Sequence, residues 1–140
     1  MKVATGEAVI LFAHGARDAR WATPLSELAE AIQARVTGVS VRSAFLELQT
    51  PTLPEALEAA ASDGARRIHV VPVFWSAAGH VDHELPPILA QFSGRHPHVV
   101  VRALPVLSEL PGMLAFIARA IAETLTPGPS PASGRGERNT

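Results

Sequence analysis

The stretch AVILFAHGARD, residues 8–18, indicates the fold class. Its first six residues are all apolar, which is typical of a strand covered on both faces in a parallel sheet. Three more short apolar or β-rich runs follow, at residues 39–48, 68–75 and 99–106. Segments with helical spacing separate these runs, so the chain is expected to alternate strand and helix.

Apolar residues at helical spacing mark the elements between the strands. The first helix is expected to have Thr23 as its N-cap and Pro24 as its first residue. Gly64 is a stop signal for the second helix, and Pro86 and Pro87 should lie in the first turn of the third, because proline disrupts a helix interior. The residues that define these faces are Leu25, Leu28, Ile32 and Val36; Leu53, Leu57 and Ala61; Leu85, Ile88, Leu89 and Phe92; and Met113, Leu114, Ile117, Ile121 and Leu125.

This order of elements predicts an α/β fold of the flavodoxin-like kind. We expect an open, parallel four-stranded sheet in the order 2-1-3-4, with helices on both faces. One domain should span residues 1–125. The segment 126–140, TPGPSPASGRGERNT, is rich in Pro, Gly and Ser and has no apolar periodicity, so it is predicted to be a disordered C-terminal tail.

The composition argues against several classes of function. A net charge of −1 leaves no basic excess, so no nucleic-acid partner is expected. The absence of cysteine excludes disulfides, thiolate metal sites and cysteine nucleophiles. The apolar runs are far shorter than the roughly 20 residues of a membrane-spanning helix, and the N-terminus lacks a clear signal-peptide cleavage site. We therefore expect a cytoplasmic protein that does not engage a membrane.

Three polar residues lie where predicted strands end. His14 follows the first strand, Glu47 closes the second, and His80 follows the third after a short loop. Because ligands bind at the carboxyl edge of parallel sheets, we expect all three at one rim. Two imidazoles and a carboxylate suit Co²⁺, Ni²⁺ or Fe²⁺, and a site with few protein ligands leaves positions open for a substrate. Each histidine taken alone could instead be a capping or hydrogen-bonding residue.

Three sequence blocks resemble those of the short sirohydrochlorin chelatases: HGARD at 14–18, AFLEL with PTLPEAL at 44–57, and VVPVFWSAAGHVDHELP at 70–86. The resemblance implies insertion of Co²⁺, Fe²⁺ or Ni²⁺, as substrate, into sirohydrochlorin or a related tetrapyrrole in siroheme or cobalamin biosynthesis. It also implies a homodimer and no organic cofactor. By this resemblance His14 and His80 bind the metal and Glu47 assists as ligand or base. Ala16 and Glu84 depart mildly from the family, which often has Ser and Asp there.

The implied substrate carries many carboxylates, which directs attention to two arginines after His14. Arg17 and Arg20 could pair with these groups, since a guanidinium matches carboxylate geometry. Alternatively, Arg17 pairs with Asp18 or with a helix carboxylate. His83 could be an auxiliary ligand, but an exposed histidine in the first turn of the helix is the favoured interpretation.

Aromatic residues also end the third predicted strand. Phe74 and Trp75 could stack on a planar macrocycle, but core or dimer contacts are the more common role of such residues. The remaining histidines have no evident partner in the sequence and are interpreted as structural or solvated: His69, His96 and His98.

Two other functions are considered. A non-catalytic carrier of metal or tetrapyrrole would use the same ligands as a chelatase. A histidine phosphatase also begins its signature with His-Gly-x-Arg, but that chemistry needs an arginine directly before the histidine, where Ala13 stands. A serine hydrolase is disfavoured because no G-x-S-x-G motif occurs.

Overall fold

The computed structural model describes residues 5–77 and 79–125 of the 140-residue chain. The tail predicted to be disordered, residues 126–140, lies outside the described residues. The chain divides into two compact units, one ending at Leu107 and the other beginning at Ser108. None of the helices in the described ranges is long and apolar enough to cross a membrane.

The described strands of the first unit form a parallel four-stranded sheet in the order β2-β1-β3-β4. This confirms the predicted fold class and strand order. Each of β2, β3 and β4 ends three residues before its apolar run does, because the last residues of each run form loops at the sheet edge. The strands are β1 (Glu7–Ala13), β2 (Val39–Phe45), β3 (Arg67–Pro72) and β4 (Val100–Ala103).

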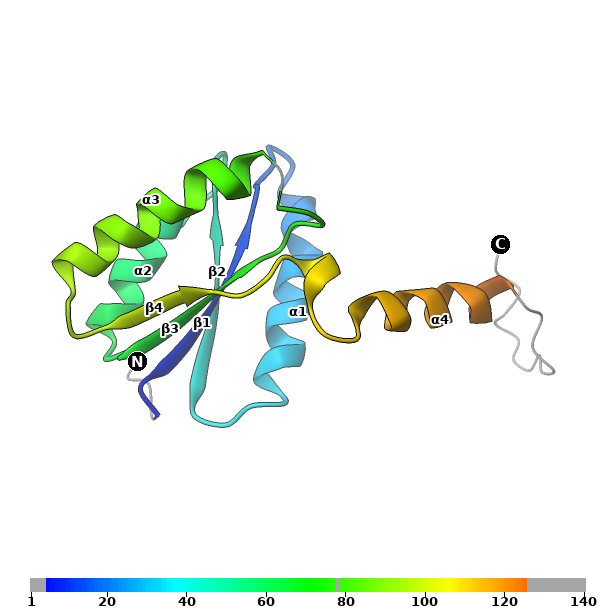
Figure 1. The fold of residues 1–140 in the computed structure, drawn as a ribbon, viewed down its shortest axis with the longest axis horizontal. Coiled ribbons are helices and arrows are strands. Elements are labelled where there is room, and N and C mark those ends of the chain that lie inside the picture. The colour runs from blue at the N-terminus through cyan, green and yellow to red at the C-terminus, as the bar shows by residue number, and fades with distance from the viewer. Residues whose placement is uncertain (1–4, 78, 126–140) are drawn as a thin grey trace. The chain divides into compact units, whose positions relative to one another are not determined.

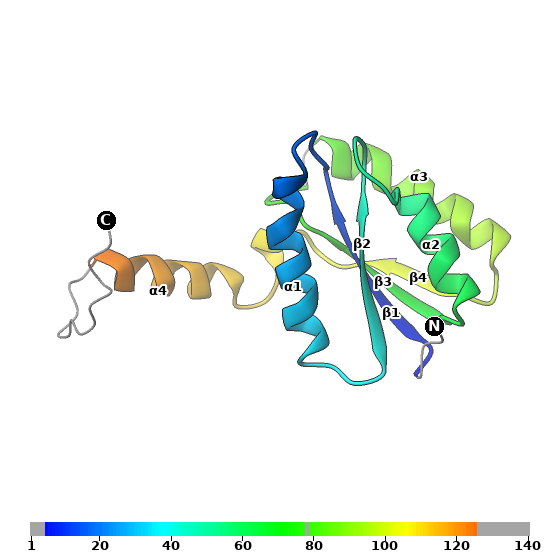
Figure 2. The ribbon, with the colours of Figure 1, turned by 180° about the vertical axis from the view of Figure 1, so that it is seen from behind.

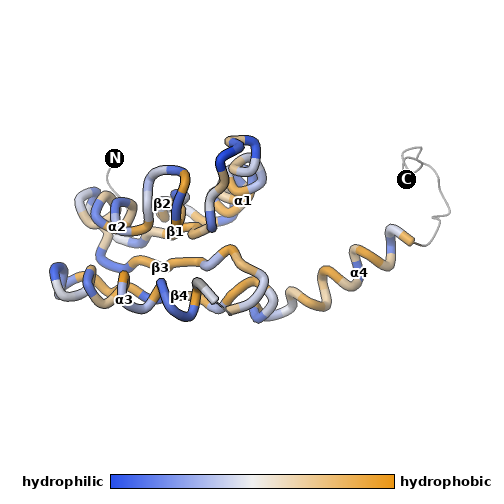
Figure 3. The backbone as a smooth tube through the Cα atoms, turned by 90° about the horizontal axis from the view of Figure 1, so that it is seen from above, coloured by the Kyte–Doolittle hydropathy of each residue, from blue (hydrophilic) through white to orange (hydrophobic). Residues whose placement is uncertain are grey.

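Helices cover both faces of this sheet (Figure 1, Figure 2). α1 (Thr23–Gln33) packs on one face, and α2 (Leu53–Ser62) and α3 (His80–Arg95) pack on the other. Alternate residues of β1 supply the two layers: Leu11 packs in the layer of α1, and Phe12 packs in the layer of α2 and α3. The tube of the central strands is accordingly mostly hydrophobic (Figure 3). Each large side chain buried in this way stabilises the fold by roughly 1.5–3 kcal/mol.

The helix starts differ from the predicted ones. The expected N-cap, Thr23, is the first residue of α1, and Ala22 is the cap residue. The reason is a short 3₁₀ helix (Ala19–Ala22) that runs directly into α1 and supplies the preceding turn. In α2 the N-cap Thr52 accepts a bond from the Glu55 amide, and the Glu55 carboxylate accepts one from the Thr52 amide.

α3 begins earlier than expected. Its first residue is His80, so Pro86 and Pro87 lie inside the helix and not in its first turn. Proline cannot donate the helical hydrogen bond, which weakens this part of the helix. Burial of Val81 and Leu85 in the core explains why the helix nevertheless includes the preceding turns.

The second unit contains α4 (Met113–Leu125), which confirms the predicted helix at these residues. Its amide-to-carbonyl bonding begins with Phe116, which donates to Gly112. The backbone tube of this helix is coloured predominantly hydrophobic (Figure 3).

Candidate functional site

The loops after β1 and β2 bring His14 and Glu47 together at the carboxyl edge of the sheet. The amide of Leu46 donates to the Ala13 carbonyl at 2.9 Å, and the amide of Glu47 donates to the His14 carbonyl at 3.1 Å. These bonds continue the pairing of β1 and β2 beyond the strands. The expectation that Glu47 closes the second strand is therefore wrong in detail, since β2 ends at Phe45 and Glu47 lies in the loop.

Gly15 permits this close approach of the two loops. Its φ of 97° is in the left-handed region that favours glycine. A Cβ atom at this position would overlap the carbonyl oxygen of Glu47. The glycine of the HGARD block is thus required by the packing of the Glu47 backbone against it.

The ring of His14 is oriented by the backbone of the next residue, Gly15. Nδ1 lies 3.2 Å from the Gly15 carbonyl oxygen, which can only accept, so this contact requires the proton on Nδ1. The lone pair of the neutral ring is then on Nε2, which lies 3.4 Å from Oε2 of Glu47. Two basic atoms at this separation can share a divalent metal ion or a proton. The side chains are 43% and 54% exposed, so a substrate can reach both.

His80 is the first residue of α3, and its side chain lies outside the part of the structure that is described. Because α3 follows the carboxyl end of β3, the backbone of His80 is at the same edge of the sheet as His14. His83 is exposed, and its amide donates to the Gly79 carbonyl at 3.2 Å. Among the described residues, no group of three or more His, Asp or Glu side chains is arranged to hold a metal ion.

The two arginines after His14 differ in their contacts. Arg20 forms a fork with Asp18, with Nη2 at 2.6 Å from Oδ2 and Nε at 3.1 Å from both carboxylate oxygens. This pairing lowers the pKa of Asp18 and raises that of Arg20. Arg17 is exposed, and no ion pair of its guanidinium is found within residues 5–77 and 79–125. Asp18 was considered as an ion-pair partner of Arg17. In the structure its partner is Arg20.

A hollow of about 180 Å³ lies beside His14, with Gln49 and Trp21 in its lining. The side-chain oxygen of Gln49 accepts from the Ala16 amide at 2.9 Å and so holds the loop after His14. Neither Gln49 nor Trp21 was predicted to have a role. The position of Gln49 directly after the AFLEL block was the available signal for it.

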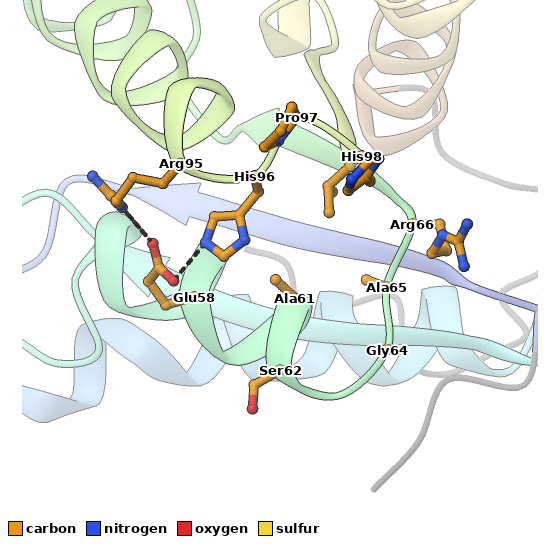
Figure 4. Close-up of a pocket in the computed structure, with 11 residues that line it drawn as sticks. Glu58, Ala61, Ser62, Gly64, Ala65, Arg66, Arg95, His96, Pro97 and His98 are labelled. Atoms are coloured by element: carbon orange, nitrogen blue, oxygen red, sulfur yellow. Dashed lines mark hydrogen bonds and ion pairs between the residues drawn. The ribbon is translucent and has the colours of Figure 1, made fainter.

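A larger hollow of about 580 Å³ lies at the opposite edge of the sheet, where β3 and β4 begin (Figure 4). Glu58 crosses it, accepting from Nη2 of Arg95 at 2.7 Å and from Nε2 of His96 at 2.8 Å. The Arg95 bond, followed by the His96 bond, lowers the pKa of Glu58. Ligands of parallel sheets bind at the carboxyl edge, so the smaller hollow beside His14 is the better candidate site.

Two of the three histidines without an evident partner in the sequence, His69 and His96, have structural contacts. His69 accepts from Nε of Arg102 at 2.9 Å through Nδ1, and its Nε2 lies 3.4 Å from Oε2 of Glu7. The ring of His96 stacks on Phe92 with centroids 4.5 Å apart. These contacts support the structural interpretation of both residues.

The model of the CbiX family matches residues 8–124. The chain belongs to the CbiX family. The matched range contains all three sequence blocks, and this confirms the resemblance on which the site residues were named.

Curated relatives of this CbiX chain carry the names of chelatases. The sirohydrochlorin cobaltochelatase of Methanococcus maripaludis is 32% identical over 88 residues, which are 63% of this chain and 61% of the relative. The sirohydrochlorin ferrochelatase of Bacillus subtilis is 30% identical over 93 residues, which are 66% of this chain and 36% of the relative. The match thus spans less than two thirds of either relative.

Solved CbiX-like structures share the fold. The CbiX protein of Marinobacter aquaeolei VT8 has a TM-score of 0.71 and 28% identity, over 85% of this chain and 97% of that one. The sirohydrochlorin chelatase SirB of Bacillus subtilis subspecies spizizenii, solved with cobalt, also has a TM-score of 0.71, at 25% identity. That match covers 88% of this chain and 51% of SirB.

Proposed function

We propose that this CbiX chain is a chelatase that inserts Co²⁺, Fe²⁺ or Ni²⁺ into sirohydrochlorin or a closely related tetrapyrrole, for siroheme or cobalamin biosynthesis. The observation that carries the proposal is the convergence of His14 Nε2 and Glu47 Oε2 at the carboxyl edge of the sheet. The names of the cobaltochelatase and ferrochelatase relatives, and the cobalt complex of SirB, support the metal and the substrate class.

The metal ion is a substrate that His14 receives through Nε2. Glu47 offers a second donor atom 3.4 Å away, and His80 is proposed as the second imidazole ligand. So few protein ligands leave coordination positions open for the pyrrole nitrogens of the macrocycle.

Insertion of the ion releases two N–H protons from the macrocycle. The Glu47 carboxylate is placed to accept one of them, since it is half-exposed and next to the metal position. An imidazole that passes its metal to the macrocycle regains a free lone pair and can accept the other. The two protons thus go to groups of this chain before they reach solvent.

We further propose that the enzyme is a homodimer. One chain has one such rim, whereas a planar macrocycle has two faces to enclose. The match to about half of the SirB chain supports this arrangement, because a second copy would supply the missing half. Light scattering at micromolar concentration should give the mass of two chains, and a monomer would contradict this proposal.

The proposed activity is tested by turnover. Sirohydrochlorin in excess over the protein is mixed with Co²⁺, Fe²⁺ or Ni²⁺, and the visible spectrum is followed against a reaction without protein. We expect several equivalents of metallated product per chain with at least one ion. A product yield that stops at one equivalent would instead support the carrier function.

A further inference from the structure

Trp21 is a large aromatic side chain that is mostly exposed to solvent. Its residue is 73% exposed, although tryptophan is on average among the more buried residues. It lies in the short 3₁₀ helix (Ala19–Ala22) that follows the HGARD block. Because Trp21 also lines the hollow that contains His14, the exposed indole is available for contact with a ligand bound there.

The backbone of Trp21 is held in place by the residues before it. Its amide donates to the Asp18 carbonyl at 3.0 Å. The carboxylate of Asp18 accepts from the amide of Arg20 at 2.9 Å and forks onto the Arg20 guanidinium. Asp18 therefore fixes the backbone turn that carries the indole, so little backbone ordering is needed when a ligand binds.

Trp21 lines two neighbouring hollows at once. The hollow of about 180 Å³ also contains His14, and a second one of about 310 Å³ contains Asp18, Arg20 and Pro24. Of the described residues, Trp21 is the one common to the two linings. A flat ligand that occupies both hollows would therefore contact Trp21.

We infer that Trp21 is the aromatic surface on which one face of the tetrapyrrole rests while its centre is presented to His14. This inference builds on the proposed chelatase function. Stacking on an indole removes apolar area of both rings from water and tolerates the varied substituents of a tetrapyrrole edge. Trp75, which is 55% exposed, lines neither of the two hollows and serves as the matched control.

The experiment compares Trp21→Ala, Trp21→Phe and Trp75→Ala with the wild-type chain. Titration of metal-free sirohydrochlorin, followed by its visible absorption, gives a Kd for each protein. We expect Trp21→Ala to raise this Kd about tenfold, Trp21→Phe to raise it less, and Trp75→Ala to leave it nearly unchanged. Calorimetric titration with Co²⁺ alone should give the same metal affinity for all four proteins, because Trp21 is not a ligand.

Three results would overturn the role of Trp21. They are an unchanged tetrapyrrole Kd in Trp21→Ala, an equal loss in Trp75→Ala, and a loss that accompanies a change of oligomeric state in light scattering. The last result would assign the indole to a subunit contact. A wild-type chain that binds sirohydrochlorin but does not metallate it would refute the chelatase function alone, and a weakened Kd in Trp21→Ala would still support the aromatic surface.

Discussion

Nε2 of His14 lies 3.4 Å from Oε2 of Glu47, although the two residues belong to loops that follow different strands. Backbone bonds hold these two loops side by side, above all the bond from the Glu47 amide to the His14 carbonyl. The pairing of β1 with β2 thus positions the two side chains before any metal arrives. Changes that disturb the loop backbones should therefore affect metal insertion even when both side chains are intact.

Gly15→Ala tests this dependence on the backbone. The new Cβ would overlap the Glu47 carbonyl, and φ at this position is 97°. We expect a fall in the free energy of unfolding of more than about 1 kcal/mol, which is the ordinary cost of alanine at such a φ. Metal insertion should fall as well, because Glu47 has to move. Urea denaturation and the insertion assay measure the two effects.

The matched control is Gly64→Ala. Gly64 has a similar φ of 103°, but no atom lies within 4 Å of the position of its added Cβ. This variant should show the cost of the backbone conformation alone and keep its insertion rate. Equal losses of stability and activity in the two variants would contradict the role given to the Gly15–Glu47 contact.

Arg17 and Arg20 should contribute unequally to substrate binding. Arg20 is engaged by Asp18, whereas Arg17 is exposed and in no ion pair in the described part of the chain. We expect Arg17→Ala to raise the KM for sirohydrochlorin several-fold, and more so at low salt, because a charge contact with a substrate carboxylate is lost. Arg20→Ala should raise it less. A larger effect for Arg20→Ala would reverse this assignment.

Glu58 should make stability depend on pH at the edge remote from the site. Its pKa is lowered in the folded state, so its contribution is complete above its unfolded pKa of about 4.3 and is lost as the pH falls through the folded value. The side chain is 43% exposed, so the effect should be modest. The stability difference between wild type and Glu58→Gln, measured by urea denaturation, should be present at pH 7 and shrink toward pH 3.

The exposed Glu27 of α1 provides the control for that measurement. Glu27→Gln should show little change in stability at either pH. A difference for Glu58→Gln that is as large at pH 3 as at pH 7 would show that the ion pairs are not its source.

The fold was predictable chiefly because β1 is apolar on consecutive residues, which suits a strand covered on both faces, and because helical spacing separates the strand-like runs. Rules based on local sequence failed to predict where a helix begins when packing against the core determines that position. Burial of Val81 and Leu85 brings α3 back to His80 in spite of the internal Pro86 and Pro87. The Thr52 cap was missed, although Thr52 and Glu55 have the spacing of a capping box and gave a readable signal.

The position of His14 and Glu47 at one edge of the sheet was predictable, but the ion pairs around them and the contacts of the other histidines were not. His14 and Glu47 could be placed at one rim because both follow parallel strands. The pairing of Arg20, and not Arg17, with Asp18 depends on the 3₁₀ helix, which has no clear periodic signal. The contacts of His69 join β3 to Glu7 and Arg102 on the neighbouring strands. Such contacts depend on register, which apolar runs alone do not specify.

The central claim is tested most directly by the rate of metal insertion in His14→Ala and His80→Ala, with sirohydrochlorin and Co²⁺ as substrates and circular dichroism as the control for folding. We expect both folded variants to lose about a hundredfold or more of the enzymatic rate, Glu47→Ala to lose less, and the exposed His83→Ala to lose little. If His14→Ala and His80→Ala are correctly folded and insert cobalt at near wild-type rates above the protein-free background, the metal site proposed here is wrong.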